Sequence, residues 1–411
     1  MASTNINKYS FGYLAKLLLL NMIHLLSFVF PRSKKIWVFG SWDGEVFLDN
    51  SKYLFLVVNL YFPQIIPIWI SRNKTLVRKL RKRGFRAYYV WNLKAIYYCL
   101  RAKYYIIDHA PCYRNLFSPA NLWLSGGAKI IQLWHGIPLK RIDRFPPTNA
   151  KKISLFGKVI SKFSPLNLVN VKINSYVVAP SNFFGKIFSS AFNVPETHLI
   201  INGYPRNDIF KISEEKRIFN LEIYELIKKY KENGGKILFY IPTFRDTGSK
   251  SDGGIDLEKL EEFLEANEAL LVIKIHAADS NTSIVNVKSS ERIILLPQDY
   301  DIYEILSLCD LLITDYSSIF FDFLSLDKPI IFFAYDLKKY QVYDREFYFN
   351  YELFVPGPII FNFKDLLKGI ATTMNQKEDK YKEKREQLRS FVFGHCCNSS
   401  EALIEEIMKV S

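Results

Sequence analysis

The chain has 411 residues, of which 49% are hydrophobic and 16% aromatic, with 18 glycines and 17 prolines. This composition excludes a disordered, collagen-like or low-complexity protein, and the length suits two or three domains that each bury a core. The net charge of +14 is unevenly divided, because residues 1–205 hold 28 basic and 6 acidic residues whereas residues 206–411 hold 27 and 35. The first half should therefore meet a polyanion: nucleic acid, an anionic membrane or a phosphate-rich substrate.

An apolar segment lies near the N-terminus at 17–30. It is shorter than the ~20 residues that a helix needs to cross a bilayer, and no small-residue cleavage site follows it. Asn21, His24 and Ser27 fall on one side of a helical projection. We expect a helix that lies in the membrane interface, flanked by cations that attract anionic headgroups. Packing of this helix on the following domain is the alternative, and a spanning anchor is a third.

Short apolar runs then alternate with helical patterns in two series. The first predicts strands at 35–40, 66–70, 86–90, 104–108 and 129–134, and helices at 50–61, 74–83 and 92–101. The second predicts strands at 236–241, 270–275, 292–296, 311–314 and 329–333, and helices at 256–267, 300–308, 318–326 and 363–371. This βαβ alternation indicates an α/β protein with two Rossmann-like domains, each a parallel sheet covered on both faces.

The predicted division has three parts. Residues 1–32 form the membrane-associated helix, 33–195 a basic N-terminal Rossmann-like domain, and 196–411 a C-terminal Rossmann-like domain with the terminal helices. The five cysteines form no CxxC pair, so neither a disulfide framework nor a zinc site is expected and a cytoplasmic setting is favoured. P-loop, GxGxxG, HExxH and GxSxG patterns are missing, and we expect no cofactor and no divalent metal.

The clearest candidate site follows the predicted strand at 311–314. Asp315, Ser317 and Ser318 come directly after it, and a helix is expected to begin near Ser318. Hydroxyls and backbone N–H groups that converge at a helix N-terminus bind anions. Ordinary capping explains one such residue but not four consecutive polar ones, so we interpret this segment as a phosphate site.

A second motif runs from 132 to 140 and contains His135, Gly136 and Lys140. A histidine at a strand end can act as a general base near neutral pH, and Gly136 allows a ligand or backbone to approach closely. Lys140 could pair with a phosphate. By itself this motif is also compatible with a capping histidine in a turn.

Three further residues follow apolar runs: His276, Arg206 and Arg245. His276 could donate to a phosphate oxygen, and arginine suits bidentate phosphate recognition. Each alone could serve a surface salt bridge. Because ligands of open α/β sheets bind at the carboxyl ends of strands, the set together indicates a cleft that handles phosphate.

Residues 72–86 hold eight basic residues and no acidic one. A solvated helix face is the plain explanation, but headgroups or a polyanionic substrate suit an unbalanced run better. No base-reading module accompanies it, so nucleic acid is not expected as a partner.

In these motifs the chain resembles the CDP-glycerol glycerophosphotransferase family of wall teichoic acid and capsule synthesis. The matching segments are 41–44, 49–54, 134–140, 203–208, 242–246, 313–322, 327–333 and 351–359, in order over roughly 36–400. The resemblance implies a GT-B arrangement with the active site in the interdomain cleft and CDP-glycerol held by the C-terminal domain. It implies transfer of glycerol phosphate to a hydroxyl of a membrane-linked acceptor, with release of CMP.

The resemblance also implies roles for the motif residues. His135 would be the base that deprotonates the acceptor hydroxyl. Pyrophosphate binding and polarisation would fall to His276, Ser317 and Ser318, with Arg206 and Arg245 assisting. Asp315 would orient its loop or contact the donor. The expected catalytic residues are thus His135 and His276, as phosphoryl transfer requires a positioned base and dispersal of developing charge.

Two alternatives stay open. One keeps the fold but uses CDP-ribitol or a nucleotide sugar as donor. The other is a non-catalytic protein that binds anionic membranes or polymers through its basic half. The expected partners are CDP-glycerol, a lipid-linked anionic acceptor and an anionic membrane surface, and the expected location is the cytoplasmic face of the plasma membrane as a peripheral protein.

Overall fold

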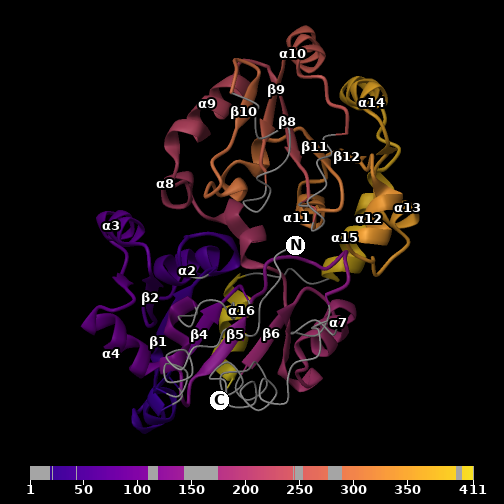
Figure 1. The fold of residues 1–411 in the computed structure, drawn as a ribbon. Coiled ribbons are helices and arrows are strands. Elements are labelled where there is room, and N and C mark those ends of the chain that lie inside the picture. Colours follow the sequence, from indigo (N-terminus) through magenta and orange to yellow (C-terminus); the bar gives the residue numbers. More distant parts are fainter. Residues whose placement is uncertain are drawn as a thin grey trace, which may run out of the picture. The chain divides into compact units, whose positions relative to one another are not determined.

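The computed structural model describes residues 19–20, 22–42, 44–109, 119–142, 175–243, 245, 253–275, 289–394 and 400–410. Two compact units make up the chain (Figure 1). The first contains Met1–His135, Asp143–Lys216 and His395–Ser411, and the second contains Gly136–Ile142 and Arg217–Gly394. Each unit is built on one parallel β-sheet.

The sheet of the first unit has seven strands in the order β3-β2-β1-β4-β5-β6-β7. Their bounds are β1 (Ser33–Gly40), β2 (Ile66–Ser71), β3 (Ala87–Tyr89), β4 (Ala102–Ile107), β5 (Lys129–Gln132), β6 (Ser175–Ala179) and β7 (Leu199–Ile201). The helices are α2 (Asp49–Tyr61), α3 (Lys74–Lys82), α4 (Leu93–Arg101), α7 (Asn182–Phe192) and α16 (Ser400–Lys409).

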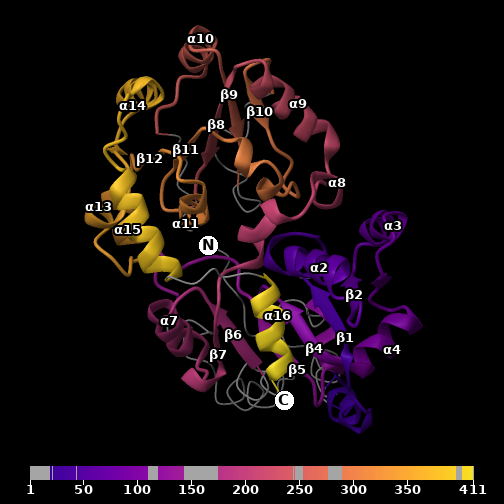
Figure 2. The same ribbon diagram turned by 180° about the vertical axis from the view of Figure 1, so that it is seen from behind.

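Both faces of this sheet are buried. Along β1 the side chains alternate: Val38 packs with Ala95 and Cys99 of α4, whereas Phe39 meets Phe55 of α2 edge to face. On the α2 side, α16 lies across the sheet (Figure 2), and the Tyr104 hydroxyl donates to the carbonyl oxygen of residue 410 at 3.0 Å. Strands that are buried on both faces have uninterrupted apolar sequences, and the strands of this sheet show that pattern.

The sheet of the second unit has six strands in the order β10-β9-β8-β11-β12-β13. Their bounds are β8 (Lys236–Ile241), β9 (Ala269–Ile273), β10 (Ile293–Leu295), β11 (Leu311–Thr314), β12 (Ile330–Phe333) and β13 (Ile359–Ile360). The helices of this unit are α9 (Leu221–Glu232), α10 (Leu257–Ala266), α11 (Ile319–Phe323), α12 (Leu337–Tyr343), α13 (Tyr351–Phe354), α14 (Phe363–Asn375) and α15 (Lys382–Phe393), and α8 (Glu214–Arg217) joins the two units.

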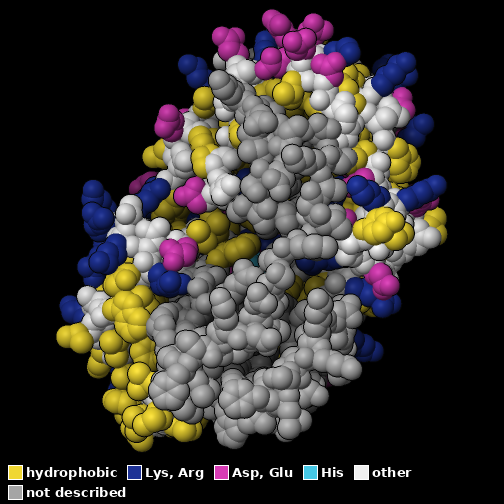
Figure 3. All heavy atoms as spheres, in the orientation of Figure 1, with side chains coloured by type: hydrophobic (Ala, Val, Ile, Leu, Met, Phe, Trp, Pro, Cys, Tyr) yellow, Lys and Arg dark blue, Asp and Glu magenta, His cyan; other side chains and the backbone are white. Residues whose placement is uncertain are grey.

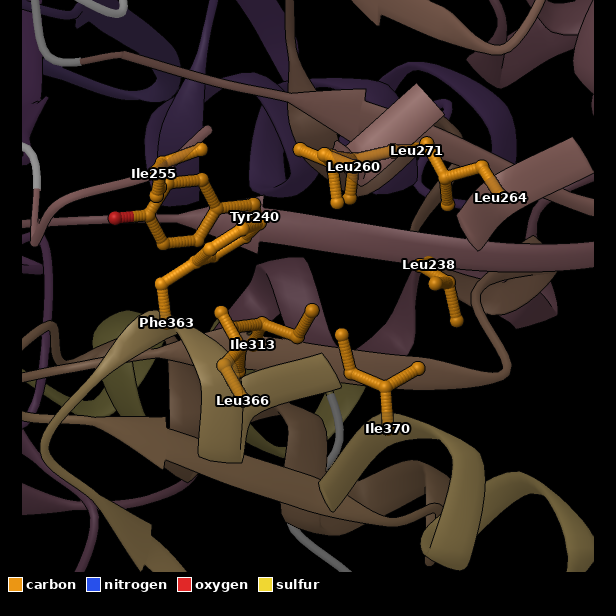
Figure 4. Close-up of a pocket in the computed structure, with 10 residues that line it drawn as sticks. All are labelled: Leu238, Tyr240, Ile255, Leu260, Leu264, Leu271, Ile313, Phe363, Leu366 and Ile370. Atoms are coloured by element: carbon orange, nitrogen blue, oxygen red, sulfur yellow. The ribbon is translucent and has the colours of Figure 1, made fainter. Parts of the chain in front are cut away.

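A small pocket lies between this sheet and the helices α10 and α14 (Figure 4). Its lining is hydrocarbon apart from the hydroxyl of Tyr240, with Leu238 from β8 and Ile313 from β11 on the sheet side. None of the predicted site residues lines it. The pocket is therefore part of the core packing, and the chemistry must be sought at the strand ends.

The prediction of two parallel α/β domains is confirmed, and most strands begin and end within two residues of the predicted positions. The predicted helix at 300–308 is wrong, because two separate 3-10 turns, Ile302–Glu304 and Leu306–Leu308, stand there. The Asp301 side chain accepts from the Tyr303 N–H at 3.1 Å, and the Glu304 carboxylate accepts from the Phe219 N–H at 3.0 Å. These bonds hold the backbone in short turns instead of a continuous helix.

The second unit includes residues 136–142, which the prediction assigned to the N-terminal domain, and the units differ from the predicted ranges at two further places. First, β7 pairs with β6, so the first sheet continues past residue 195. Second, α16 belongs to the first unit. There the Asp208 carboxylate accepts from the Ser400 hydroxyl at 2.9 Å and so caps the start of α16. The prediction placed α16 in the C-terminal domain because this helix follows that domain in the sequence.

The N-terminal segment packs on the first unit with its polar side inward. Residues 19–20 and 22–26 are helical, and Ser27–Val29 form a 3-10 turn. His24 and Ser27 are buried, whereas Leu25, Leu26 and Val29 are 59%, 62% and 75% exposed. Among the described residues no helix is both long and apolar enough to span a bilayer. His24 and Ser27, two polar residues of the expected interfacial helix, therefore face the protein.

Arg32 anchors this segment through backbone carbonyl oxygens. Its guanidinium donates to the carbonyl oxygens of Cys99 at 2.7 Å, Ser27 at 3.0 Å and Leu124 at 2.8 Å, and also to that of Gly126. Cys99 lies in the last turn of α4, where unpaired carbonyls attract cations. Burial lowers the pKa of Arg32. One side chain thus ties the N-terminal segment to α4 and to the loop before β5.

Candidate active site

His135 lies just beyond the carboxyl end of β5, next to the end of β4. The Leu133 N–H donates to the Ile107 carbonyl oxygen at 2.7 Å, which extends the pairing of the two strands. Trp134 then adopts a left-handed backbone with φ of 59°. Trp42 and Asp49 at the neighbouring end of β1 also have positive φ. Three non-glycine residues in this costly conformation at one sheet edge mark a site whose surroundings hold it in shape.

The His135 imidazole is fixed in one tautomer. Its Nδ1 lies 3.1 Å from the backbone carbonyl oxygen of Asp108. Because a carbonyl oxygen can only accept, Nδ1 carries the proton and the lone pair of the neutral ring resides on Nε2. The ring is half-buried. This is the state that a general base requires before it takes a proton from a hydroxyl.

A buried network holds the backbone around His135. Arg206, only 2% exposed, donates through Nη1 to the His135 carbonyl oxygen at 2.9 Å and to Asp49 Oδ1 at 2.6 Å. Asn50 donates to the Trp134 carbonyl oxygen at 2.8 Å and accepts from the Arg206 N–H at 3.3 Å. Arg206, which the sequence placed in the donor domain, therefore lies in the first unit beside His135. Its role in donor binding stays a prediction.

Asp108 is a second buried carboxyl at this edge. It accepts from the Ser41 hydroxyl at 3.0 Å and from the Ser51 N–H at 3.2 Å, and so links the ends of β1 and β4 to the first turn of α2. Burial, and then the charge of Asp49, raise the pKa of Asp108 well above its ordinary value. The main-chain carbonyl of this rigid residue orients His135, which makes Asp108 a positioning residue.

Sequence reasoning missed His109. Its ring stacks on that of His135 with a centroid distance of 3.9 Å and on the Trp42 indole at 3.8 Å. His109 follows β4 in the way that His135 follows β5. The expectation that chemistry gathers after strand ends could have found it, had the search continued one residue past the predicted strand.

In the second unit, Arg245 and Asp315 form the centre of a different cluster. Arg245 Nη2 lies 2.9 Å from Asp315 Oδ2, and its Nε lies 2.8 Å from Asp336 Oδ2. All three side chains are buried. Burial lowers the pKa of Arg245, but the charge of Asp315 and the hydrogen bond to Asp336 outweigh it, so the net shift is upward. One guanidinium is shared by two carboxylates, which fixes the Arg245 head group in the unit.

Tyrosines surround this ion cluster. The Tyr316 hydroxyl donates to Asp336 at 2.8 Å, and the Tyr351 hydroxyl donates to the Asp315 carbonyl oxygen at 2.9 Å. Asp315 Oδ1 also accepts from the Thr243 N–H at 2.8 Å, so its carboxylate joins the loop after β8 to the loop after β11. The two roles expected of Asp315, orientation of its loop or contact with the donor, stay predictions.

The serines of the same loop are half-buried at the start of α11, which begins at Ile319 as expected. Ser317 Oγ accepts from the Ile319 N–H at 3.5 Å. The hydroxyl of Thr314, part of the polar run in the sequence, donates to the Ile241 carbonyl oxygen at 2.7 Å and is thus committed to the sheet. Phosphate binding by Ser317 and Ser318 stays a prediction.

The remaining predicted residues lie elsewhere or outside the described part. Lys140 is half-buried, and its backbone forms an antiparallel bridge with Phe347 of the second unit. His276 lies outside the described residues. Two residues before it, Lys274 donates to the carbonyl oxygens of Pro297 at 2.6 Å and Gln298 at 2.7 Å, and burial lowers its pKa to about 8. The described residues include no cluster of three or more His, Cys, Asp or Glu able to hold a metal.

The predicted residues thus fall into two groups. His135 and Arg206 meet at the strand ends of the first unit, and Arg245, Asp315, Ser317 and Ser318 gather at the strand ends of the second. The sequence pattern of the family described as CDP-glycerol:poly(glycerophosphate) glycerophosphotransferase matches residues 21–409. The chain belongs to this family. The predicted enzyme class is thereby confirmed.

Individual relatives agree with the assignment. The chain is 29% identical over 410 residues to a teichoic acid poly(glycerol phosphate) polymerase of Bacillus spizizenii, covering 94% of this chain and 97% of the relative. It is 30% identical over 269 residues to a teichoic acid poly(ribitol-phosphate) polymerase of the same organism, covering 64% of this chain and 40% of the relative. A solved structure of the wall teichoic acid polymerase TagF matches with a TM-score of 0.71 and 25% identity over 96% of each chain.

Proposed function

We propose that this family member transfers glycerol phosphate from CDP-glycerol to a hydroxyl of a membrane-linked, teichoic acid-type acceptor. The acceptor oxygen forms a bond to the phosphorus that bears the glycerol, the bridging P–O bond breaks, and CMP leaves with the bonding electrons. Nε2 of His135 takes the proton of the hydroxyl. The single observation that carries the proposal is the tautomer of His135: the Asp108 carbonyl holds the ring proton on Nδ1, so the lone pair of the neutral ring is on Nε2.

The donor is assigned to the second unit. Asp315 and Arg245 fix the loops after β8 and β11, and Ser317 and Ser318 stand beside them with half-buried hydroxyls at strand ends. Such positions suit the pyrophosphate of a nucleotide donor. His276, Arg206 and Lys140 complete the proposed phosphate-binding set. The proposal includes a GT-B arrangement, in which the donor and acceptor units act on substrates bound in a common cleft.

A membrane surface is part of the proposal. The N-terminal segment exposes Met22, Leu25 and Val29, and the neighbouring helix α4 exposes Leu93 and Tyr97. Figure 3 shows a hydrophobic area over the N-terminal segment and α4, at the lower left, and Lys and Arg side chains over α3 above it. Anionic lipid is the occupant that satisfies both, because its acyl region takes the apolar side chains and its headgroups take the cations. The proposal includes a peripheral location on the cytoplasmic face of the plasma membrane.

The function is tested by CMP release from CDP-glycerol in the presence of membranes that carry acceptor. The wild-type protein should release CMP, and His135→Gln should lower the rate by about 10²–10⁴-fold, as loss of a general base does. His198→Gln is the control, because His198 stacks on Tyr176 elsewhere in the same unit. Absence of CMP release by the wild type would favour the non-catalytic alternative, and unchanged release by His135→Gln would remove His135 from the mechanism.

CDP-ribitol is the second candidate donor, and the match to a poly(ribitol-phosphate) polymerase supports its inclusion. The two donors differ in the length of the polyol and share the pyrophosphate and cytidine. Parallel assays at equal concentration, compared as kcat/KM, decide between them. A higher kcat/KM for CDP-ribitol would replace glycerol phosphate by ribitol phosphate in the proposed reaction.

A further inference from the structure

His109 stands between an exposed indole and the proposed base. The centroids of Trp42 and His109 are 3.8 Å apart with planes 27° from parallel, and those of His109 and His135 are 3.9 Å apart with planes 21° from parallel. The Trp42 side is 37% exposed, and the His109 side chain is 20% exposed. The three rings therefore form one stacked column that leads from the surface to His135.

The backbone holds the two histidines at this spacing. Ile107 and Gln132 are paired partners on β4 and β5. The buried Gln132 side chain donates from Nε2 to the His109 carbonyl oxygen at 3.3 Å and accepts through Oε1 from the Trp134 N–H at 2.9 Å. One amide thus spans the two loops that carry the histidines. The stack results from paired strand ends joined by side-chain bonds, so its geometry is preorganised.

The charged groups near His109 differ from those near His135. Arg206, on the side of His135, places its guanidinium 2.9 Å from the His135 carbonyl oxygen, and Asp49 is its ion-pair partner. On the side of His109, Asp108 Oδ1 lies 3.9 Å from His109 Nδ1. A proton bound by one imidazole repels a proton on the other at this distance. Arg206 contacts His135 at its main-chain oxygen and is compensated by Asp49, whereas the Asp108 carboxyl lies beside the His109 ring, so the carboxyl directs the first proton to His109.

We propose that His109 is a positioning residue that fixes the plane of the His135 ring and, by binding the first proton, keeps His135 neutral as the pH falls. The inference deepens the proposed function, on which it rests. It assigns His109 no contact with the substrates and no proton transfer in the reaction. Its effect is to widen the pH range over which Nε2 of His135 can accept a proton.

Histidine NMR tests the proposal without any turnover. The chain has six histidines, so the ring signals of ¹³C-histidine-labelled protein can be assigned by single substitutions. His109→Phe keeps an aromatic ring in the stack but cannot be protonated. The protonation midpoint of His135 should rise in this variant by about half a pH unit or more, because the opposing charge is gone. His198→Phe, which alters a histidine stacked on Tyr176 at 4.7 Å, should leave the midpoint unchanged.

Kinetics supply the second readout. In His109→Phe the acid limb of the kcat profile should move to higher pH by the same amount, while the plateau kcat stays within about threefold of the wild type. In His109→Ala, which also removes the ring, the plateau kcat should fall by about tenfold or more with KM unchanged. An unchanged His135 midpoint in His109→Phe overturns the inference even if the enzyme is active. A wild type that releases no CMP defeats the proposed function instead, and the NMR result still decides the role of His109.

Discussion

Arg206 Nη1 binds the carbonyl oxygen of His135 at 2.9 Å while it pairs with the Asp49 carboxylate at 2.6 Å. The two contacts connect the loop after β5, the first residue of α2 and the 3-10 turn Pro205–Lys211. Arg206 therefore orders the proposed base through the main chain, from a position that is 2% exposed. A charge at this depth is tolerable only because Asp49 compensates it.

Arg206→Met should therefore destabilise the protein by about 3–5 kcal/mol, because the Asp49 carboxylate loses its buried partner. Denaturant unfolding measures the loss. The control is Arg72→Met, which breaks an exposed pair with Glu45 at 3.7 Å and should cost less than about 1 kcal/mol. Adding Asp49→Asn to Arg206→Met should recover part of the stability. Equal stability of the two single variants would contradict this account of the pair.

Gly126 permits the close approach of the N-terminal segment. A Cβ at this position would lie 2.6 Å from a Phe28 ring carbon and 2.8 Å from the His24 carbonyl oxygen. Gly126→Ala should therefore cost about 1–3 kcal/mol and loosen the segment. Trypsin should then cut after Arg32 several-fold faster, because displacement of Ser27 and Gly126 removes acceptors of the guanidinium.

Gly185→Ala is the matched control for this change. The new methyl group would meet the side-chain ends of Ile201 and Leu199 at 3.1 Å, and alanine suits the interior of α7. Its cleavage after Arg32 should match the wild type. Wild-type protection of Arg32 in Gly126→Ala would show that the segment does not depend on this contact.

Lys274 predicts a pH dependence of stability. Burial lowers its pKa to about 8, so the folded state loses this proton at a lower pH than the unfolded chain, whose lysines titrate near ~10.4. Between these values the unfolded state binds more protons, and the free energy of unfolding contributed by this group rises with pH. From pH 7 to 9.5 the gain is about 2 kcal/mol.

The measurement is denaturant unfolding at both pH values for the wild type and Lys274→Met. The methionine variant loses the bonds to Pro297 and Gln298 at every pH. The effect of the Lys274 proton is therefore seen only in the change of the free energy of unfolding between the two pH values. That difference should be about 2 kcal/mol smaller in the variant. Equal differences would mean that Lys274 titrates alike in both states.

Membrane docking should depend on the outward apolar side of the N-terminal segment. Leu25 is 59% exposed, and its transfer from water to an acyl environment contributes about 1.5–3 kcal/mol. Leu25→Glu should weaken co-sedimentation with anionic lipid vesicles by about tenfold or more. Leu221→Glu, at an equally exposed leucine that begins α9, is the control and should bind like the wild type. Equal binding of both variants would exclude this side as the docking surface.

The sequence allowed the sheets to be predicted because buried parallel strands appear as uninterrupted apolar runs, as in β8 and β11. It did not predict α16 in the first unit, since the bond from Ser400 to Asp208 joins residues far apart in the chain. His135 was found because its motif is local. Its supporting residues Asp49, Asn50 and Asp108 come from other strand ends, and only the folded chain brings them together.

The packing of the N-terminal segment could not be predicted from its sequence pattern either. A helical projection separates His24 and Ser27 from their apolar neighbours, yet it does not say which side meets the protein. Here the Ser27 hydroxyl finds the His24 carbonyl at 2.6 Å and the Gly126 N–H at 2.8 Å, so its polar group is satisfied in the interior. Because these hydrogen bonds satisfy Ser27, the segment packs with this polar side toward the protein, which is opposite to the usual orientation of an amphipathic helix.

The chain passes from the first unit to the second between His135 and Gly136, so no spacer separates the proposed base from the second unit. The backbone that carries the proposed base is therefore also the backbone by which the chain enters the second unit. A substitution at Gly136 should consequently affect the orientation of His135 and the start of the second unit together.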